Sequence, residues 1–291
     1  DGQISVGGVS LSLLAARVGR TPFYAYDRAL LCDRVAELRR VLPSTVGLHY
    51  AVKANPMPAL VGLMAGLVDG LDVASAGEMR IALDAGMASA HISLAGPGKT
   101  DAELHQAVAA GILVNVESPR ELQVLAEASR TLKRPARVAV RVNPNFELKS
   151  SGMKMGGGPK QFGIDAEAVP NALQEIARFG LAFEGLHIFS GSQNLRAEAI
   201  CEAQDKAFDM AIRLARAAPA PMRTLNLGGG FGIPYFPGEK ALDLAPIGEA
   251  LHRLADAAVA RLPGTQLVVE LGRFLVGEAG LYVTRVLDRK V

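Results

Sequence analysis

Short apolar runs alternate with longer amphipathic stretches along almost the whole chain. The apolar runs are rich in β-branched residues and predict strands at about 46–53, 71–75, 92–96, 112–117, 137–143, 183–190, 224–229 and 267–271. Helical spacing fills nearly every gap, as in 27–42, where leucine and valine recur every three or four positions. Eight β-then-α units within about 230 residues favour a closed (β/α)8 TIM barrel over an open sheet.

Helix start signals agree with this division. Thr100 with Glu103, and Ser118 with Glu121, have the spacing of a capping box. In such a box each side chain accepts a hydrogen bond from the backbone amide of the other residue. We therefore expect helices to begin directly after residues 100 and 118.

Two regions lie outside the repeating units. Residues 1–26 precede the first predicted barrel strand, and residues 144–165 form a long glycine-bearing loop after the fifth strand. A loop of that length inside a compact domain is usually functional or mobile. We expect an N-terminal segment at 1–26, the barrel at 27–280, and at 281–291 the first strand of a C-terminal β-domain that is cut short.

Composition narrows the classes of partner. The 291 residues carry 31 basic and 29 acidic side chains, with no basic block, so we expect no nucleic acid. No apolar run approaches the roughly 18 residues that span a bilayer, so we expect no membrane partner. Cys32 and Cys201 have no metal-ligand spacing and are too few for a disulfide framework. These observations favour a reducing, cytoplasmic setting without a metal site.

Polar side chains gather at the predicted carboxyl ends of the strands, where barrel enzymes build their active sites. The residues at these ends are Lys53, Asp72, Ser75, Glu117, Arg141, Asn143, His187, Ser190 and Glu270, with Gly228, Gly229 and Gly230 after the seventh strand. Few structural requirements would place a lysine, a histidine, an arginine and carboxylates on one rim. The pattern therefore predicts an active site there.

Lys53 is the candidate nucleophile of this rim. It ends the apolar run LHYAVK, and an amine that is poorly solvated is suited to imine formation. A lysine that only extends from the rim into solvent fits the strand equally well. The glycines of LNLGGGFGIPY favour the functional interpretation, because consecutive glycines expose backbone N–H groups that bind phosphate. Barrels commonly bind phosphate after strands seven and eight.

Segments along the whole chain resemble the fold-type III pyridoxal-phosphate enzymes, whose barrel is of the alanine-racemase type. These segments are TPFYAYD at 21–27, HYAVKAN at 49–55, DVASAGE at 72–78, RVNP at 141–144, QFGI at 161–164, HIFSGSQ at 187–193, LGGGFGIPY at 227–235 and VELGRFLVG at 269–277. The likeness is to diaminopimelate, ornithine and arginine decarboxylases, and includes a diaminopimelate-decarboxylase-like subgroup associated with exosortase loci. It implies pyridoxal 5'-phosphate as cofactor and decarboxylation of a basic or dibasic amino acid.

The resemblance implies three catalytic residues. Lys53 would hold the cofactor aldehyde as a Schiff base, His187 would stack on the pyridine ring, and Glu270 would pair with the pyridinium nitrogen. A carboxylate there keeps the nitrogen protonated, which makes the ring a strong electron sink when CO2 departs. Taken alone, a strand histidine such as His187 is more often a satisfied core residue.

Further residues resemble the family's cofactor contacts and their neighbours, namely Asp72, Glu78, Arg141, Ser190, Gly229, Gly230, Tyr235 and Arg273. Ser190, both glycines and Arg273 would bind the phosphate, which Tyr235 would also reach. Two of these residues have structural alternatives. Arg273 has the weaker alternative of a salt bridge at the rim, and Glu78 with Ser75 has the spacing of a capping box.

Departures from the family pattern keep alternatives open. HIFSGSQ is longer than the HIGSQ of typical diaminopimelate decarboxylases, which leaves the substrate open. Full-length relatives continue into a β-rich domain that completes the active site of a partner subunit, which implies a homodimer. The alternatives are an amino-acid racemase, which Glu270 disfavours because such enzymes place an arginine at the ring nitrogen, and a non-catalytic pyridoxal-phosphate carrier. The run 281–291 disfavours the carrier, because it has the pattern of a further domain's first strand.

Overall fold

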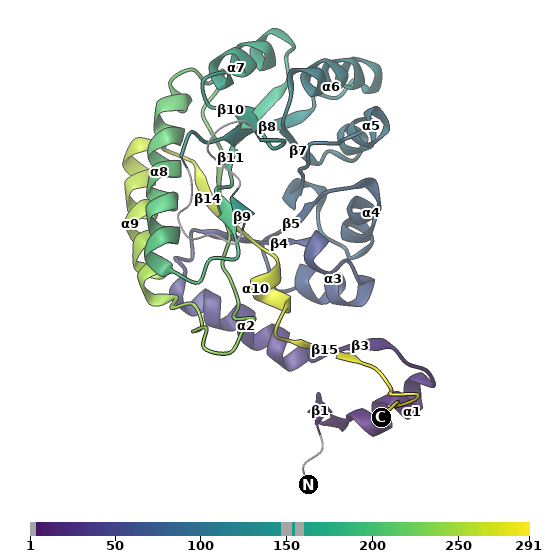
Figure 1. The fold of residues 1–291 in the computed structure, drawn as a ribbon. Helices are drawn as coiled ribbons and strands as arrows, with labels where there is room; N and C mark the ends of the chain where they lie inside the picture. The colour runs from purple at the N-terminus through teal and green to yellow at the C-terminus, as the bar shows by residue number, and fades with distance from the viewer. Residues whose placement is uncertain (1–3, 147–152, 155–159) are drawn as a thin grey trace.

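A closed barrel of eight parallel strands forms the centre of the computed structural model, which describes residues 4–146, 153–154 and 160–291 (Figure 1). The strands are β4 (Gly47–Ala51), β5 (Gly70–Val73), β6 (Ile92–Leu94), β7 (Leu113–Val116), β8 (Arg137–Asn143), β11 (Ala182–Ile188), β13 (Thr224–Gly229) and β14 (Gln266–Leu271). Each strand pairs with the next, and β14 pairs with β4 to close the ring. The predicted TIM barrel is confirmed, with all eight strands close to their expected positions.

Helices surround the barrel, and their apolar faces cover the strands (Figure 1). They are α2 (Arg28–Val41), α3 (Pro58–Ala65), α4 (Ala76–Asp84), α5 (Asp101–Ala110), α6 (Pro119–Leu132), α7 (Val169–Arg178), α8 (Ala197–Ala215) and α9 (Ala245–Arg261). Leu38 of α2 and Leu48 of β4 are fully buried in this layer. Truncating either leucine to alanine would cost about 2–5 kcal/mol of the free energy of unfolding.

The two expected capping boxes differ in the structure. Thr100 and Glu103 exchange both hydrogen bonds and begin α5 as expected. At α6, the Ser118 hydroxyl accepts the Glu121 N–H, but the Glu121 carboxylate accepts the N–H of Glu117 instead of returning the bond. The expected second box is therefore half formed, because the Glu121 carboxylate turns toward a buried lysine 3.1 Å away.

Segments from both ends of the chain meet at one side of the barrel, near helix α1 (Leu11–Val18) (Figure 1). There β3 (Phe23–Tyr26) pairs antiparallel with β15 (Gly280–Val283). Two further strands, β1 (Ser5–Val6) and β2 (Val9–Ser10), form a separate hairpin before α1. No helix in the described part of the chain has the length and apolar character to cross a membrane.

The long loop after β8 is described only in part. Within it β9 (Met153–Lys154) pairs with β12 (Gly191–Ser192), and β10 (Ile164–Asp165) pairs with the carboxyl end of β8. The three consecutive glycines at 156–158 lie outside the described residues. The β9–β12 pairing brings this loop to the segment that follows β11, at the carboxyl end of the barrel.

Candidate active site

Lys53 lies just beyond the first barrel strand. The predicted strand 46–53 ends at Ala51, and Lys53 belongs to the 3-10 turn η1 (Val52–Ala54). The Tyr50 hydroxyl donates to the Asn55 carbonyl over 3.0 Å and so ties the strand to the end of this turn. The Lys53 side chain is 60% exposed, and its Nζ lies 3.6 Å from Glu270 Oε1. The turn therefore presents the amine to solvent beside a carboxylate.

Glu270 is the buried anion of the site. It lies near the end of β14, with its Oε2 3.2 Å from His187 Nε2 and 3.5 Å from Asn226 Nδ2, which donates to it. Burial alone would raise the pKa of Glu270, but the charges of Lys53, His187 and Arg141 outweigh burial and hold that pKa well below its usual range. Glu270 is therefore a carboxylate at neutral pH.

His187 of β11 is buried with unused hydrogen-bonding capacity. Nδ1 has no partner among the described residues, and Nε2 approaches Glu270 without the alignment of a hydrogen bond. Leaving a buried polar group unpaired costs about 1–3 kcal/mol. This arrangement does not fit the alternative of a satisfied core histidine.

Lys53 and Glu270 border two adjacent cavities at the carboxyl end of the barrel, which also share Phe189 and Ser192. The first, of about 440 Å³, opens over the ends of β5, β6 and β8 and contains Asp72, Arg141 and His187. The second, of about 510 Å³, opens over the glycine-rich turn and contains Gly230, Tyr235 and Arg273. The predicted lysine, histidine, carboxylates and arginines are thus brought together.

Two glycines at the end of β13, of which Gly230 borders the second cavity, let backbone segments approach one another closely. Gly230 has φ +78°, which favours glycine, and a Cβ there would collide with the Gly191 carbonyl oxygen. A Cβ on Gly229 would collide with the carbonyl oxygen of Glu270. Glycine is therefore required at both positions for the close packing of β13 and the following turn against β14 and the segment after β11.

Arg273 is an exposed cation that borders the same cavity as Lys53. It begins the short helix α10 (Arg273–Val276), donates to Gln193 Oε1 over 3.1 Å, and its guanidinium lies 5.4 Å from the centre of the Tyr235 ring. No carboxylate lies within ion-pair distance of Arg273 in the described ranges. The alternative of a salt bridge at the rim is therefore not observed for Arg273, and its guanidinium is available to bind an anion.

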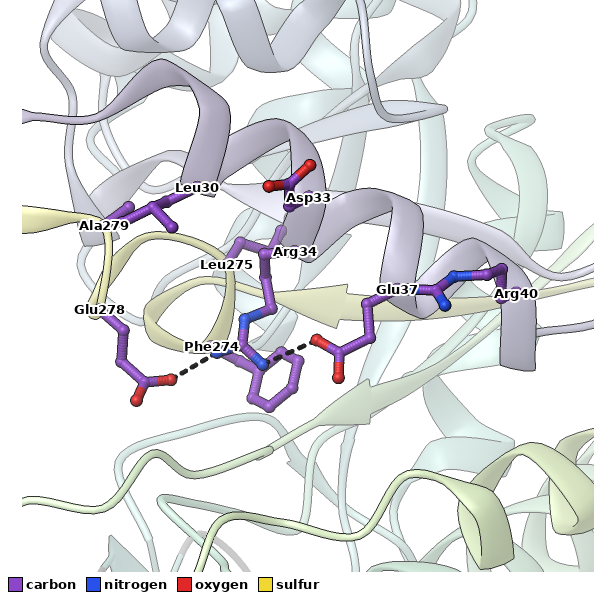
Figure 2. Close-up of a pocket in the computed structure, with 9 residues that line it drawn as sticks. All are labelled: Leu30, Asp33, Arg34, Glu37, Arg40, Phe274, Leu275, Glu278 and Ala279. Atoms are coloured by element: carbon purple, nitrogen blue, oxygen red, sulfur yellow. Dashed lines mark hydrogen bonds and ion pairs between the residues drawn. The ribbon is translucent and has the colours of Figure 1, made fainter. Parts of the chain in front are cut away.

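Helix α10 packs against α2, which holds it in place (Figure 2). Arg34 of α2 donates to Glu37 over 3.0 Å and to Glu278 over 2.5 Å, and its guanidinium lies 4.7 Å from the centre of the Phe274 ring. Phe274 in turn packs edge-on against Phe231, which follows the glycine-rich turn. These contacts fix the helix that carries the exposed arginine relative to the glycines.

Asp72 belongs to a row of hydrogen-bonded side chains that runs across four neighbouring strands, from β4 to β7. Its Oδ1 lies 3.1 Å from His49 Nδ1 and accepts from the Ser93 hydroxyl over 2.5 Å, and Ser93 accepts from Asn115 over 3.1 Å. Burial would lower the pKa of His49, but the Asp72 carboxylate outweighs burial and raises it. The other oxygen of Asp72 is buried and has no partner among the described residues.

Three residues expected at the site, Ser190, Gly229 and Glu78, border neither cavity. Ser190 is buried after β11 and borders neither cavity, whereas Ser192, two residues later, borders both. Glu78 accepts the Ala74 N–H, and its own N–H donates to Ser75 Oγ. Glu78 therefore stabilises the start of α4, as the alternative of a helix cap expected. The phosphate role of Ser190 stays a prediction.

Lys99 borders the first cavity and was not expected there. Its side chain is 1% exposed, and Nζ lies 3.1 Å from Glu121 and 3.8 Å from Glu117. The signal in the sequence is GPGK just after β6, which places a lysine one short turn beyond a strand end.

Among the described residues no group of histidine, cysteine and carboxylate side chains could hold a metal ion.

Comparisons with known proteins agree with this site. Residues 28–277 match the family model "Pyridoxal-dependent decarboxylase, pyridoxal binding domain". The chain is 36% identical to an L-glutamyl-[BtrI acyl-carrier protein] decarboxylase of Niallia circulans over 93% of its own length and 64% of the relative's. It is 35% identical to the diaminopimelate decarboxylase of Aquifex aeolicus over 98% of its length and 67% of the relative's.

Solved structures give the same result for the fold. The diaminopimelate decarboxylase of Helicobacter pylori, solved with L-lysine, superposes with a TM-score of 0.84 at 28% identity, over 96% of this chain and 70% of that one. The chain thus spans about two thirds of the length of the relatives it matches. The match of 28–277 contains all eight barrel strands and every lining residue of both cavities except Tyr26, and the chain belongs to the pyridoxal-dependent decarboxylase family.

Proposed function

We propose that this chain is the cofactor-binding barrel of a pyridoxal-phosphate-dependent amino-acid decarboxylase. The observation that carries the proposal is the position of Lys53. Its solvent-facing amine lies 3.6 Å from the buried carboxylate of Glu270, between a cavity with a free arginine and a cavity with a buried aspartate. An amine nucleophile, a buried anion and an anion-binding turn are the three groups that a phosphorylated pyridine aldehyde requires.

The residues fit that cofactor at each of its polar ends. The Gly230 turn and Arg273 offer backbone N–H groups and a guanidinium to a phosphate. Glu270 offers a buried carboxylate to a protonated ring nitrogen, and the buried, unpaired Nδ1 of His187 lies on the same wall. Lys53 offers the amine for the aldehyde.

Each of these residues has a distinct task in decarboxylation. When bound, the cofactor supplies an electron sink for the electron pair released as the α-carboxyl leaves as CO2. Glu270 would hold a proton on the ring nitrogen of the bound cofactor, because the charges around it lower the pKa of Glu270 and keep it a carboxylate. Arg273 and the glycine turn anchor the phosphate, so that the bond to be broken keeps one orientation. Phe189 lines both cavities and contributes apolar surface beside Lys53.

For the substrate we propose a basic or dibasic amino acid, because several relatives are named diaminopimelate decarboxylases. The longer HIFSGSQ segment pairs with β9 and so lies where it would alter the substrate cavity. We also propose that the whole protein, with the β-rich domain that its relatives have, is a homodimer, and that these 291 residues alone dimerise weakly or not at all. The free thiols of Cys32 and Cys201 support a cytoplasmic setting.

The proposal is tested by incubating the purified protein and pyridoxal phosphate with single amino acids and measuring CO2 release. The panel contains meso-diaminopimelate, lysine, ornithine and arginine, with glutamate as the acidic control. We expect release from one basic or dibasic amino acid. Release from glutamate alone contradicts the substrate class, and cofactor binding without release from any amino acid supports the carrier alternative. Light scattering measures the oligomeric state.

A further inference from the structure

Glu117 joins three separate segments around the first cavity. It directly follows β7 and is buried. Its Oε1 accepts the Gly96 N–H over 2.5 Å and a hydrogen bond from Arg141 Nη1 over 2.9 Å, and its Oε2 accepts the Gly163 N–H over 3.0 Å. One carboxylate thus holds the loop after β6, the guanidinium of β8 and the end of the long loop at 160–163.

A buried lysine and a second carboxylate surround this group. Lys99 donates to the Gly96 carbonyl over 2.6 Å and lies 3.1 Å from Glu121, whose carboxylate accepts the Glu117 N–H. The cations Lys99 and Arg141 therefore face the carboxylates Glu117 and Glu121. Removing any one of these four charges leaves another charge buried and unbalanced. Burial would raise the pKa of Glu117, but Arg141 and Lys99 outweigh burial and lower it, so Glu117 is ionised at neutral pH.

Arg141 is fixed between two partners. Glu117 binds one edge of its guanidinium, and the ring centre of Phe162 lies 4.8 Å from the guanidinium carbon. Gly163 follows Phe162, and its own bond to Glu117 keeps that ring in place. An arginine side chain has many rotamers, and fixing one of them costs conformational entropy that these contacts offset. The guanidinium therefore faces the cavity of Lys53 and Glu270 in one orientation.

We infer that Glu117 is a positioning residue, which acts on the bound cofactor through Arg141. It holds the Arg141 guanidinium at the wall of the cofactor cavity and joins the two loops that form that wall. The inference rests on the proposed function, because it requires the cofactor to bind at Lys53. It predicts that the charge and reach of Glu117 set the environment of the bound cofactor, although Glu117 borders neither cavity itself.

The test compares Glu117→Gln with Glu121→Gln. Both changes remove one buried carboxylate from the same group of charges, but only Glu117 contacts Arg141. The readouts are the dissociation constant for pyridoxal phosphate and the pH midpoint of the absorbance band of the lysine-bound cofactor. For Glu117→Gln we expect about tenfold weaker binding and a lower midpoint, because the unbalanced Arg141 disfavours positive charge on the lysine nitrogen. Glu121→Gln should change both much less.

A double-mutant comparison shows whether Glu117 acts through Arg141. In an Arg141→Met background, Glu117→Gln should lose its excess effect and match Glu121→Gln. An excess that persists there, or equal effects of the two glutamine variants in the wild-type background, overturns the inference. Wild-type protein that gains no borohydride-stable cofactor label overturns the proposed function instead. If Glu117→Gln does not fold, Glu117→Asp keeps the charge, shortens the reach, and is compared in the same two backgrounds.

Discussion

Lys53 and Lys99 each lie one short turn beyond a barrel strand and border the same cavity, yet their environments are opposite. The Lys53 side chain is 60% exposed and faces one carboxylate at 3.6 Å, whereas Lys99 is 1% exposed and has two carboxylates around it. A lysine with its donors in use holds loops together, and a lysine that reaches into an open cavity can react. The same residue type at the same rim thus has a chemical role on the β4 side and a structural role on the β6 side.

The largest effect separates the two lysines by chemistry. Borohydride reduction of the cofactor-loaded protein should add a phosphopyridoxyl mass to Lys53, and Lys53→Ala should lose this label completely. The alanine variant should keep its fold, because an exposed rim lysine contributes little packing. Peptide mapping by mass spectrometry locates the label. A label on Lys99 in the wild type would reverse the assignment of the two lysines.

The second effect separates them by stability. Lys99→Met leaves Glu117 and Glu121 buried with a single cation, Arg141, and should lower the free energy of unfolding by about 3–5 kcal/mol. Lys206→Met is the matched control, because it breaks an exposed pair with Glu202 on α8 and should cost about 0.3–0.5 kcal/mol. Urea unfolding followed by circular dichroism measures both. Similar losses for the two variants would show that Lys99 has no special structural role.

The third effect tests the anion beside the reactive lysine. Glu270→Gln removes the negative charge at the ring nitrogen, so single-turnover CO2 release should fall by about one to two orders of magnitude, or about 1.4–2.8 kcal/mol of activation free energy. Cofactor affinity should change less, since Arg273 and Lys53 remain. Glu121→Gln is the control, because Glu121 is a buried carboxylate that borders neither cavity. Exchange of the α-proton without CO2 release from the wild type would favour the racemase alternative.

Periodicity in the sequence was enough to predict the barrel. Buried parallel strands are continuous apolar runs, so all eight could be recognised, and the rim followed from their order. Lys53 lies later than expected relative to its strand, because the chain leaves β4 at Ala51 and enters a turn that apolar periodicity does not detect.

The site was predicted less completely, for a different physical reason. Lys99 and Glu117 have their roles only because two loops and a strand end meet, and such contacts between distant segments leave no local pattern. Ser192 borders both cavities because Gly191 and Ser192 pair with a two-residue strand in the long loop. A strand of two residues has no periodicity, and the prediction of Ser190 came from the family resemblance, in which Ser192 had no part.

The smallest effect compares the two sides by their response to pH. On the β4 side, Asp72 raises the pKa of His49, so the folded protein binds a proton there that the unfolded chain loses near pH 6.5. The resulting stability is complete below that pH and is lost as pH rises through the higher pKa of the folded state, with a slope of at most about 1.4 kcal/mol per pH unit.

Glu117 on the other side has a lowered pKa, so its contribution to stability is present above about pH 4.5 and is lost on acidification.

The measurement is urea unfolding across pH 4–9 for wild type and His49→Gln. Asp72, Glu270 and Asp69 are the charged groups that act on His49, and all three remain in the variant. We expect the free energies of unfolding of the two proteins, plotted against pH, to converge only at the alkaline end. There His49 has lost its proton in the folded wild type, so the wild type keeps no advantage over the variant. Convergence at the acidic end instead would mean that His49 is neutral in the folded protein.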